Sequence, residues 1–109
     1  MGYRKLTEVD QVTPGTMAKF SIDPHMILLV NVNGAFYALD NKCPHLGGDL
    51  SGGKLDGETI TCPRHGAQFD VRTGNNLAGA KIAFVNMKVG NAKSYPVRVE
   101  GHDVLVNLP

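Results

Sequence analysis

Apolar and polar positions follow the two-residue period of β-strands at several points along the chain. Residues 17–22 alternate in this way, as expected of a strand that buries one face. Residues 27–32 form a nearly continuous β-prone run, and residues 36–39 form a second one. Asn33 and Gly34 separate these two runs, and this dipeptide is typical of a tight hairpin turn. The pattern predicts a three-stranded meander within the first forty residues.

The middle of the chain has shorter apolar runs. Residues 54–58 are predicted to form a turn that leads into a short strand at 59–61, and residues 69–71 are predicted to form the next strand. Residues 75–93 mix partial alternation with Gly, Asn and Lys. This stretch is therefore expected to be a long excursion that includes one strand.

The end of the chain alternates clearly again. Tyr95, Val97 and Val99 alternate with other residues, and a turn at 101–103 leads to a last apolar run at 104–106. No stretch of convincing length has a helical period. The thirteen glycines and six prolines favour short strands joined by tight turns. These patterns predict an all-β chain whose two ends form one antiparallel base, with the middle inserted as a lobe.

Composition narrows the choice of partners. A chain of 109 residues supports one domain with a modest core. The net charge is +1 and the basic residues are scattered, so neither nucleic acid nor a membrane is an expected partner. The longest apolar run, residues 26–30, is too short to cross a bilayer, and the first residues lack the apolar segment of a signal peptide. A soluble cytoplasmic protein is expected.

The only two cysteines of the chain each lie close to a histidine. Cys43 and His45 form one pair, Cys62 and His65 form the other, and sixteen residues separate the pairs. Because cytoplasmic thiols stay reduced, such clusters favour a metal over a disulfide. Zinc is one candidate, although common zinc modules pair ligands of one kind. The other is a binuclear iron cluster with both Cys on one iron and both His on the other.

The motifs around these residues resemble those of a known family. Residues 43–47 (Cys-Pro-His-Leu-Gly) and 62–66 (Cys-Pro-Arg-His-Gly) are similar to the paired motifs of Rieske proteins. The flanking residues 40–42 and 68–74 agree with this resemblance, and the ending at 95–101 is similar to that of small Rieske-type ferredoxins. The resemblance covers nearly the whole chain and is weakest after the second motif.

The resemblance implies one Rieske [2Fe–2S] cluster per chain. Its ligands would be Cys43, His45, Cys62 and His65. It also implies a Rieske iron–sulfur domain over residues 1–109. In that domain an antiparallel β-sandwich base, at about 1–40 and 75–109, would carry a cluster-binding lobe at about 41–74.

The residues near the motifs indicate a low reduction potential. Two neutral imidazoles make the cluster less negative than four thiolates would, which raises its potential above that of plant-type ferredoxins. Hydrogen bonds to the sulfurs raise it further. High-potential Rieske proteins of respiratory complexes carry hydroxyl residues and an extra cysteine pair at positions that correspond here to Ala67, Phe69, Gly48 and Arg64. A low-potential cluster without a disulfide is therefore expected.

Several other polar residues have simpler interpretations. Arg64 lies between two predicted ligands and either guides an acidic partner or is a solvated loop charge. Asp70 is expected to brace the lobe through loop hydrogen bonds. His25 and His102 stand alone in turn contexts and are expected to be solvated.

No nucleophile–base pair or phosphate loop is recognisable, so the chain is not expected to be an enzyme or to bind a small-molecule substrate. It resembles the ferredoxin component of multicomponent aromatic-ring dioxygenases. Such a component passes single electrons from a flavin NAD(P)H reductase to a terminal oxygenase. Three alternatives remain at this stage: a small Rieske-like subunit of an assimilatory nitrite reductase, a structural zinc-binding interaction module, and an iron–sulfur redox sensor.

Overall fold

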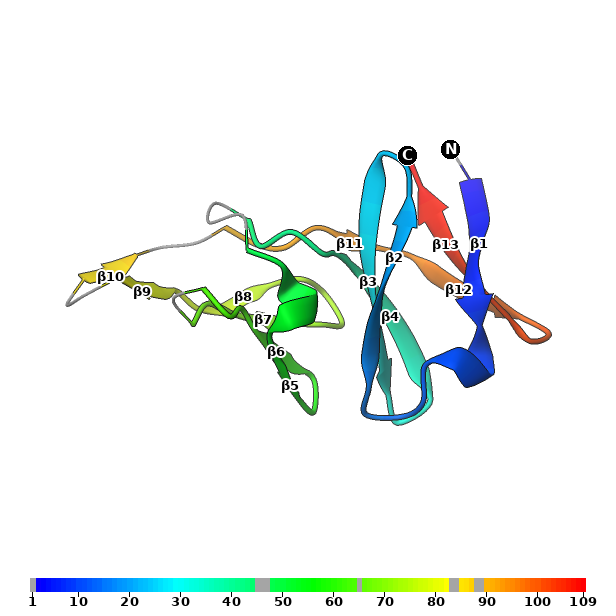
Figure 1. Ribbon diagram of the computed structural model, residues 1–109, viewed down its shortest axis with the longest axis horizontal. Coiled ribbons are helices and arrows are strands. Elements are labelled where there is room, and N and C mark those ends of the chain that lie inside the picture. The colour runs from blue at the N-terminus through cyan, green and yellow to red at the C-terminus, as the bar shows by residue number, and fades with distance from the viewer. Residues whose placement is uncertain (1, 45–47, 65, 83–84, 88–89) are drawn as a thin grey trace.

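The computed structural model describes residues 2–44, 48–64, 66–82, 85–87 and 90–109, and it describes side chains outside residues 80–89. Two antiparallel sheets form a base, and a smaller sheet forms a lobe beside them (Figure 1). The described elements are strands apart from two short 3₁₀ turns, which confirms the predicted all-β class. No helix of the described residues is long and apolar enough to span a membrane.

The first sheet of the base joins the two ends of the chain. It contains β1 (Gly2–Glu8), β13 (Asp103–Leu108) and β12 (Val97–Glu100), in that order. β1 runs antiparallel to β13, with Gly2 opposite Leu108, and it leads into the 3₁₀ turn η1 (Val9–Gln11). This pairing confirms that the two ends form one antiparallel base. β1 itself is a strand that the alternation did not indicate.

The second sheet of the base contains the predicted meander. Its order is β11 (Ser94–Tyr95), β4 (Ala35–Asp40), β3 (His25–Val32) and β2 (Met17–Ile22). Asn33 and Gly34 connect β3 to β4 with φ angles of 52° and 94°. Positive φ at both central residues defines the type I′ turn, whose twist matches that of the flanking strands. The predicted hairpin and its neighbouring strand β2 are therefore confirmed.

Strand β3 is buried on both faces, because it lies between the first sheet and the lobe. Ile27 and Leu29 belong to an apolar cluster shared with β13 of the first sheet. Leu28 and Val30, which point the other way, belong to a second cluster shared with the lobe. All four side chains are fully buried. This two-sided burial explains the unbroken apolar run in the sequence.

The lobe is a four-stranded antiparallel sheet of very short strands. Its order is β5 (Lys54–Asp56), β6 (Thr59–Thr61), β7 (Gln68–Asp70) and β8 (Asn76–Ala78), and the 3₁₀ turn η2 (Leu50–Gly52) precedes it. The prediction of a turn over residues 54–58 is wrong in its first part, because 54–56 form β5. Leu55, the one apolar residue of β5, lies opposite Ile60. A single apolar residue gives no alternation to detect.

Residues 75–93 contain more strand than predicted. They include β8, β9 (Ala80–Ile82) and β10 (Val85–Met87), where one strand was expected. β9 and β10 pair only with each other among the described residues and form a two-stranded ribbon that projects beyond the lobe (Figure 1). A strand of three residues is too short to show a clear two-residue alternation of apolar and polar positions. The sequence pattern therefore predicted too few strands in this stretch.

The predicted alternating strand at the end of the chain is divided between the two sheets of the base. Tyr95 pairs with Ala38 of β4 in the second sheet, whereas Val97 begins β12 in the first sheet. Pro96 lies at the point of transfer, and a proline cannot donate the hydrogen bond that would continue either ladder. The chain therefore changes sheets there, which helps to fix one sheet of the base onto the other.

Candidate metal centre

Two strands of different sheets deliver the two cysteines. Cys43 follows β4 of the base, and Cys62 follows directly after β6 of the lobe. Each cysteine is only 1% exposed, and both belong to the apolar cluster between the base and the lobe. Neither forms a disulfide. Two buried thiols at the base of neighbouring loops are suitable donors for a soft metal.

Each cysteine begins a loop that the backbone closes at once. The N–H of Cys43 donates to the carbonyl oxygen of Gly48 over 2.6 Å, and the N–H of Cys62 donates to that of Ala67 over 2.7 Å. These bonds close loops 43–48 and 62–67. The two predicted histidine ligands, His45 and His65, fall inside these loops but lie outside the described residues.

The two loops meet at Gly48. A Cβ atom built on Gly48 would lie 3.2 Å from the sulfur of Cys62 and 3.2 Å from Cδ of Arg64. Such contacts are tighter than normal packing, so this position is closely fitted to a glycine. The first loop is thus packed directly against the sulfur and the arginine stem of the second. The geometry brings the two predicted motifs together.

Gly66 shapes the second loop in a different way. Its φ is +75°, in the left-handed region that glycine adopts without steric cost, and a Cβ there would meet no neighbouring atom. The left-handed backbone turn therefore explains why residue 66 is a glycine. Close packing of a neighbouring atom against this position does not explain it.

Asn41 supports the first loop and was not recognised as a site residue from the sequence. It is 2% exposed, and its Oδ1 accepts the N–H of Ser51 at 2.9 Å. Its backbone donates to Met26 of β3 and accepts from Leu50 of η2. Asn41 thus ties the base to both ends of the first ligand loop. The sequence does carry a signal for this role, since Asn41 lies between a strand and a ligand motif. An asparagine there can form side-chain hydrogen bonds with the backbone of the following loop.

Asp70 braces the lobe, as predicted. Its Oδ1 accepts the backbone N–H of Arg72 at 2.9 Å, and its Oδ2 lies 3.0 Å from the guanidinium of Arg72. The same guanidinium lies 3.0 Å from a carboxylate oxygen of Glu58. Hydrogen bonding from Arg72 holds the pKa of Asp70 below its ordinary value, and the two carboxylates raise the pKa of Arg72. Both shifts favour the charged forms of Asp70 and Arg72, so this ion pair is structural.

The remaining histidines differ from each other. His102 is exposed, as expected. His25 is only partly exposed, because its ring packs edge-on against Tyr95 with the centroids 6.1 Å apart. Burial raises the pKa of that tyrosine. Among the described residues, which exclude His45 and His65, no three His, Cys, Asp or Glu side chains come together as a metal site.

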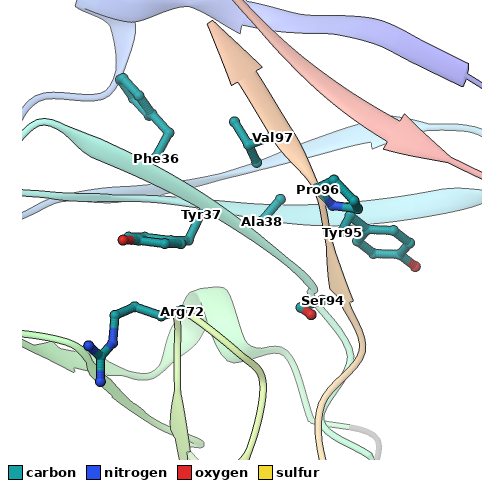
Figure 2. A pocket seen from close by; sticks show the side chains of 8 residues that line it. All are labelled: Phe36, Tyr37, Ala38, Arg72, Ser94, Tyr95, Pro96 and Val97. Atoms are coloured by element: carbon teal, nitrogen blue, oxygen red, sulfur yellow. The ribbon is translucent and has the colours of Figure 1, made fainter.

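A cavity of about 400 Å³ lies where the lobe meets the base (Figure 2). Its lining comes mainly from β4, β11 and β12, and Figure 2 shows Arg72 on the lobe side, with its guanidinium directed away from the β11 and β12 residues. The Arg72 guanidinium is already paired with Asp70 and Glu58. Of the predicted ligands that the structure describes, neither Cys43 nor Cys62 lines the cavity, which is a feature of the junction between base and lobe.

Comparison with known proteins identifies the class. A family model described as the Rieske [2Fe-2S] domain matches residues 3–96. The biphenyl dioxygenase ferredoxin subunit of Pseudomonas sp. (strain KKS102) is 37% identical over 109 residues, covering 99% of this chain and 94% of that protein. The chain belongs to the Rieske [2Fe–2S] domain family.

Solved structures agree. The ferredoxin of carbazole 1,9a-dioxygenase from Nocardioides aromaticivorans IC177 superimposes with a TM-score of 0.81 at 29% identity, over 97% of both chains. A chain from a complex of reduced oxygenase and oxidised ferredoxin in carbazole 1,9a-dioxygenase matches with a TM-score of 0.76 at 28% identity, over 96% of this chain and 92% of that one.

These findings confirm the predicted family, the Rieske fold and one [2Fe–2S] cluster per chain. They also confirm the prediction of an electron carrier, since the relatives are ferredoxin components and not catalytic subunits. The site fits the cofactor, because Cys43 and Cys62 are buried, free of disulfide and held in loops that touch.

Proposed function

We propose that this protein is the ferredoxin component of a multicomponent aromatic-ring dioxygenase system in the cytoplasm. It passes single electrons from a flavin NAD(P)H reductase to a terminal oxygenase. The proposal is supported by the biphenyl dioxygenase ferredoxin subunit, whose whole length this chain nearly matches. It is supported further by the similarity to a ferredoxin found in complex with an oxygenase.

We infer that the cluster is held by the four predicted ligands, Cys43, His45, Cys62 and His65. In a Rieske cluster the two thiolates would bind one iron and the two imidazoles the other. The contact of Gly48 with the Cys62 sulfur carries this assignment, because it joins the two loops around two buried thiols. When bound, a [2Fe–2S] cluster accepts and returns one electron. The chain supplies the ligands, excludes water on the cysteine side and holds both loops in place.

The base and the lobe form a single domain in this proposal. The apolar cluster that contains both cysteines also contains Leu28 of the base and Phe69 of the lobe. Because neither part buries its apolar residues of this cluster alone, both are needed to form the site.

The potential of the cluster is proposed to lie near the bottom of the range of Rieske centres. Ala67 and Phe69 are fully buried beside the second loop, and neither carries a hydroxyl to donate to a sulfur. A redox titration of the purified protein is expected to give a low midpoint. A midpoint well above about +100 mV, within the family range of roughly −150 to +300 mV, would contradict this proposal.

The decisive experiment is an EPR spectrum of the dithionite-reduced protein. We expect a rhombic signal of low average g, typical of mixed Cys and His ligation. His45→Asn and His65→Asn should each abolish this signal, whereas His102→Asn, at an exposed histidine outside the motifs, should preserve it. A colourless, EPR-silent protein that contains stoichiometric zinc would contradict the electron-carrier function.

A further inference from the structure

Along its described elements, the chain passes between the base and the lobe twice. The first passage leads from β4 to β5 and contains the first ligand loop. The second passage leads from β8 through the β9–β10 ribbon back to β11. Residues 91–95, the return segment, end this second passage, and Figure 1 shows them in orange where the chain leads into β11. The return segment contains none of the predicted ligands, yet it is bonded to both parts of the molecule that carry them.

On the lobe side, the return segment is bonded to the turn that follows β7. The N–H of Ala92 donates to the carbonyl oxygen of Gly74 over 2.7 Å. Oδ1 of Asn91 accepts the N–H of Asn76, the first residue of β8, over 2.8 Å. Ala92 is buried and belongs to the apolar cluster that contains both cysteines. The return segment is therefore packed into the lobe as well as bonded to it.

On the base side, the same segment is bonded to the end of β4. The N–H of Asp40 donates to the carbonyl oxygen of Lys93 over 2.8 Å, and β11 continues this contact as a neighbouring strand of β4. Asp40 ends β4 three residues before Cys43, and its Oδ1 accepts the N–H of Lys42 over 3.1 Å. The return segment thus holds the backbone that leads directly into the first ligand loop.

Gly74 closes the junction, because a residue with a side chain could not approach the return segment as closely. Its φ is +81°, a left-handed conformation that glycine adopts without steric cost. A Cβ atom built there would overlap the carbonyl oxygen of Ala92 and lie 3.6 Å from Cδ2 of Leu39, a buried residue of β4. The oxygen is a backbone atom and cannot turn away as the end of a flexible side chain can. A larger residue at position 74 must therefore displace the return segment or the lobe.

The two bonded ends of the return segment correspond to the two ligand loops. β4 leads to Cys43. The turn at Gly74 follows β7, which pairs with β6, and β6 leads to Cys62. The separation of the loops is therefore set in two ways, directly where Gly48 meets the Cys62 sulfur and indirectly through the return segment.

We propose that the return segment, closed against Gly74, is a positioning element that holds the two ligand loops at the separation the cluster requires. This inference rests on the proposed function, because the proposed ligand assignment places one pair of ligands in each loop. Groups outside the ligands fix the orientation of the ligands and so tune both metal affinity and the properties of the bound metal. Displacement of the return segment should therefore change the spectrum and the retention of the cluster, beyond any effect on folding.

Two glycine substitutions in the lobe test this role. Gly74→Ala and Gly57→Ala both place a side chain at positive φ, +81° and +59°, but a Cβ atom at Gly57 would meet no neighbouring atom. Gly74→Ala should change the EPR line shape of the reduced protein, and the variant should lose iron to a chelator about tenfold faster or more. Gly57→Ala should keep the line shape and the rate of the unmodified protein. An unchanged spectrum and rate in Gly74→Ala, or equal changes in both variants, would overturn the proposal.

A milder set of variants decides the question if Gly74→Ala does not fold. Asn91→Ala removes the acceptor for the N–H of Asn76, and Thr73→Val removes the acceptor for the N–H of Asn75 within the lobe itself. Both side chains are exposed. Only Asn91→Ala should shift the EPR line shape, and Asn91→Asp, which keeps the acceptor, should restore it. The same shift in Thr73→Val, or no shift in Asn91→Ala, would count against a positioning role and overturn the proposal.

Hydrogen exchange of the iron-loaded variants reports on the backbone itself. In Gly74→Ala the amides of Asp40 and Ala92 should exchange faster than in Gly57→Ala, because their acceptors are displaced. Equal exchange in the two variants would show that Gly74 does not hold the return segment in place, which would overturn the proposal. Absence of a Rieske-type EPR signal from the unmodified protein would instead refute the proposed electron-carrier function, and this inference with it.

Discussion

In the base, β1 to β4 and β13 have six to eight residues each, whereas every strand of the lobe has three. Long ladders carry many cross-strand pairs, and β3 buries apolar side chains on both of its faces. The lobe has few such pairs. It is held by one apolar cluster shared with the base and by loop hydrogen bonds.

This difference shows how a small redox protein divides its tasks. The base has long ladders and an apolar cluster of its own. The lobe presents short ligand loops, and we expect metal binding to contribute to their folding. Changes to the cofactor should therefore affect the lobe first, and changes on the face of β3 that packs against the first sheet should affect overall stability without changing the cluster.

Loss of the cluster should produce the largest effect. Removal of the iron by a chelator, or Cys62→Ser, should greatly accelerate hydrogen exchange in β6 and β7, because the loop 62–67 loses its anchor. Exchange in β3 and β4 should change much less. Hydrogen-exchange mass spectrometry measures both regions in one experiment. Equal protection of the lobe with and without iron would show that the lobe folds independently of the metal.

Two adjacent leucines on β3 allow a matched comparison of base and lobe. Leu28 is buried toward the lobe and Leu29 toward the first sheet, and both are fully buried. Each substitution by alanine should lower the free energy of unfolding by about 2–5 kcal/mol. Only Leu28→Ala should also weaken cluster retention, measured by visible absorption during denaturant unfolding. If Leu29→Ala released iron as readily, the two apolar clusters would not be separate.

Two buried asparagines give a smaller contrast. Asn41 binds the N–H of Ser51 beside the first ligand loop, and Asn31 donates to Val12 and accepts from Gly34 within the base. Alanine at either position should cost about 1–3 kcal/mol, because buried backbone groups lose their partners.

The EPR line shape should distinguish the two substitutions. Asn41→Ala should change it, since Asn41 positions the first ligand loop, while Asn31→Ala should leave it unaltered. Asn41→Asp keeps an acceptor for Ser51 and should restore most of the original line shape. An unchanged spectrum in Asn41→Ala would limit Asn41 to a stabilising role.

The Asp70 brace should give the smallest effect. Asp70→Asn should cost about 1 kcal/mol at neutral pH, since the guanidinium of Arg72 is half exposed and water screens the pair. Because the pKa of Asp70 is lowered in the folded state, its contribution is complete above the ordinary value of 3.8. It is lost as the pH falls through the lowered value. Denaturant unfolding of both proteins at several pH values checks this, and a difference that grew on acidification would contradict it.

Much of the base could be predicted from the sequence, because its strands carry a visible period. Residues 17–22 alternate and became β2, and Asn33-Gly34 marks the hairpin between β3 and β4. The short strands of the lobe could not be predicted in this way. β5 has a single apolar residue, and the exposed Leu77 is the only large apolar side chain of β8.

The sequence by itself determined the chemistry: two Cys and His pairs in spaced motifs, an all-β chain, and no hydroxyl at Ala67 or Phe69. These features depend on residue type and on local spacing. The tertiary structure alone decided that Gly48 packs on the Cys62 sulfur and that Asn41 ties the base to the first loop. Contacts between distant residues depend on how the chain is folded, and no local pattern encodes them.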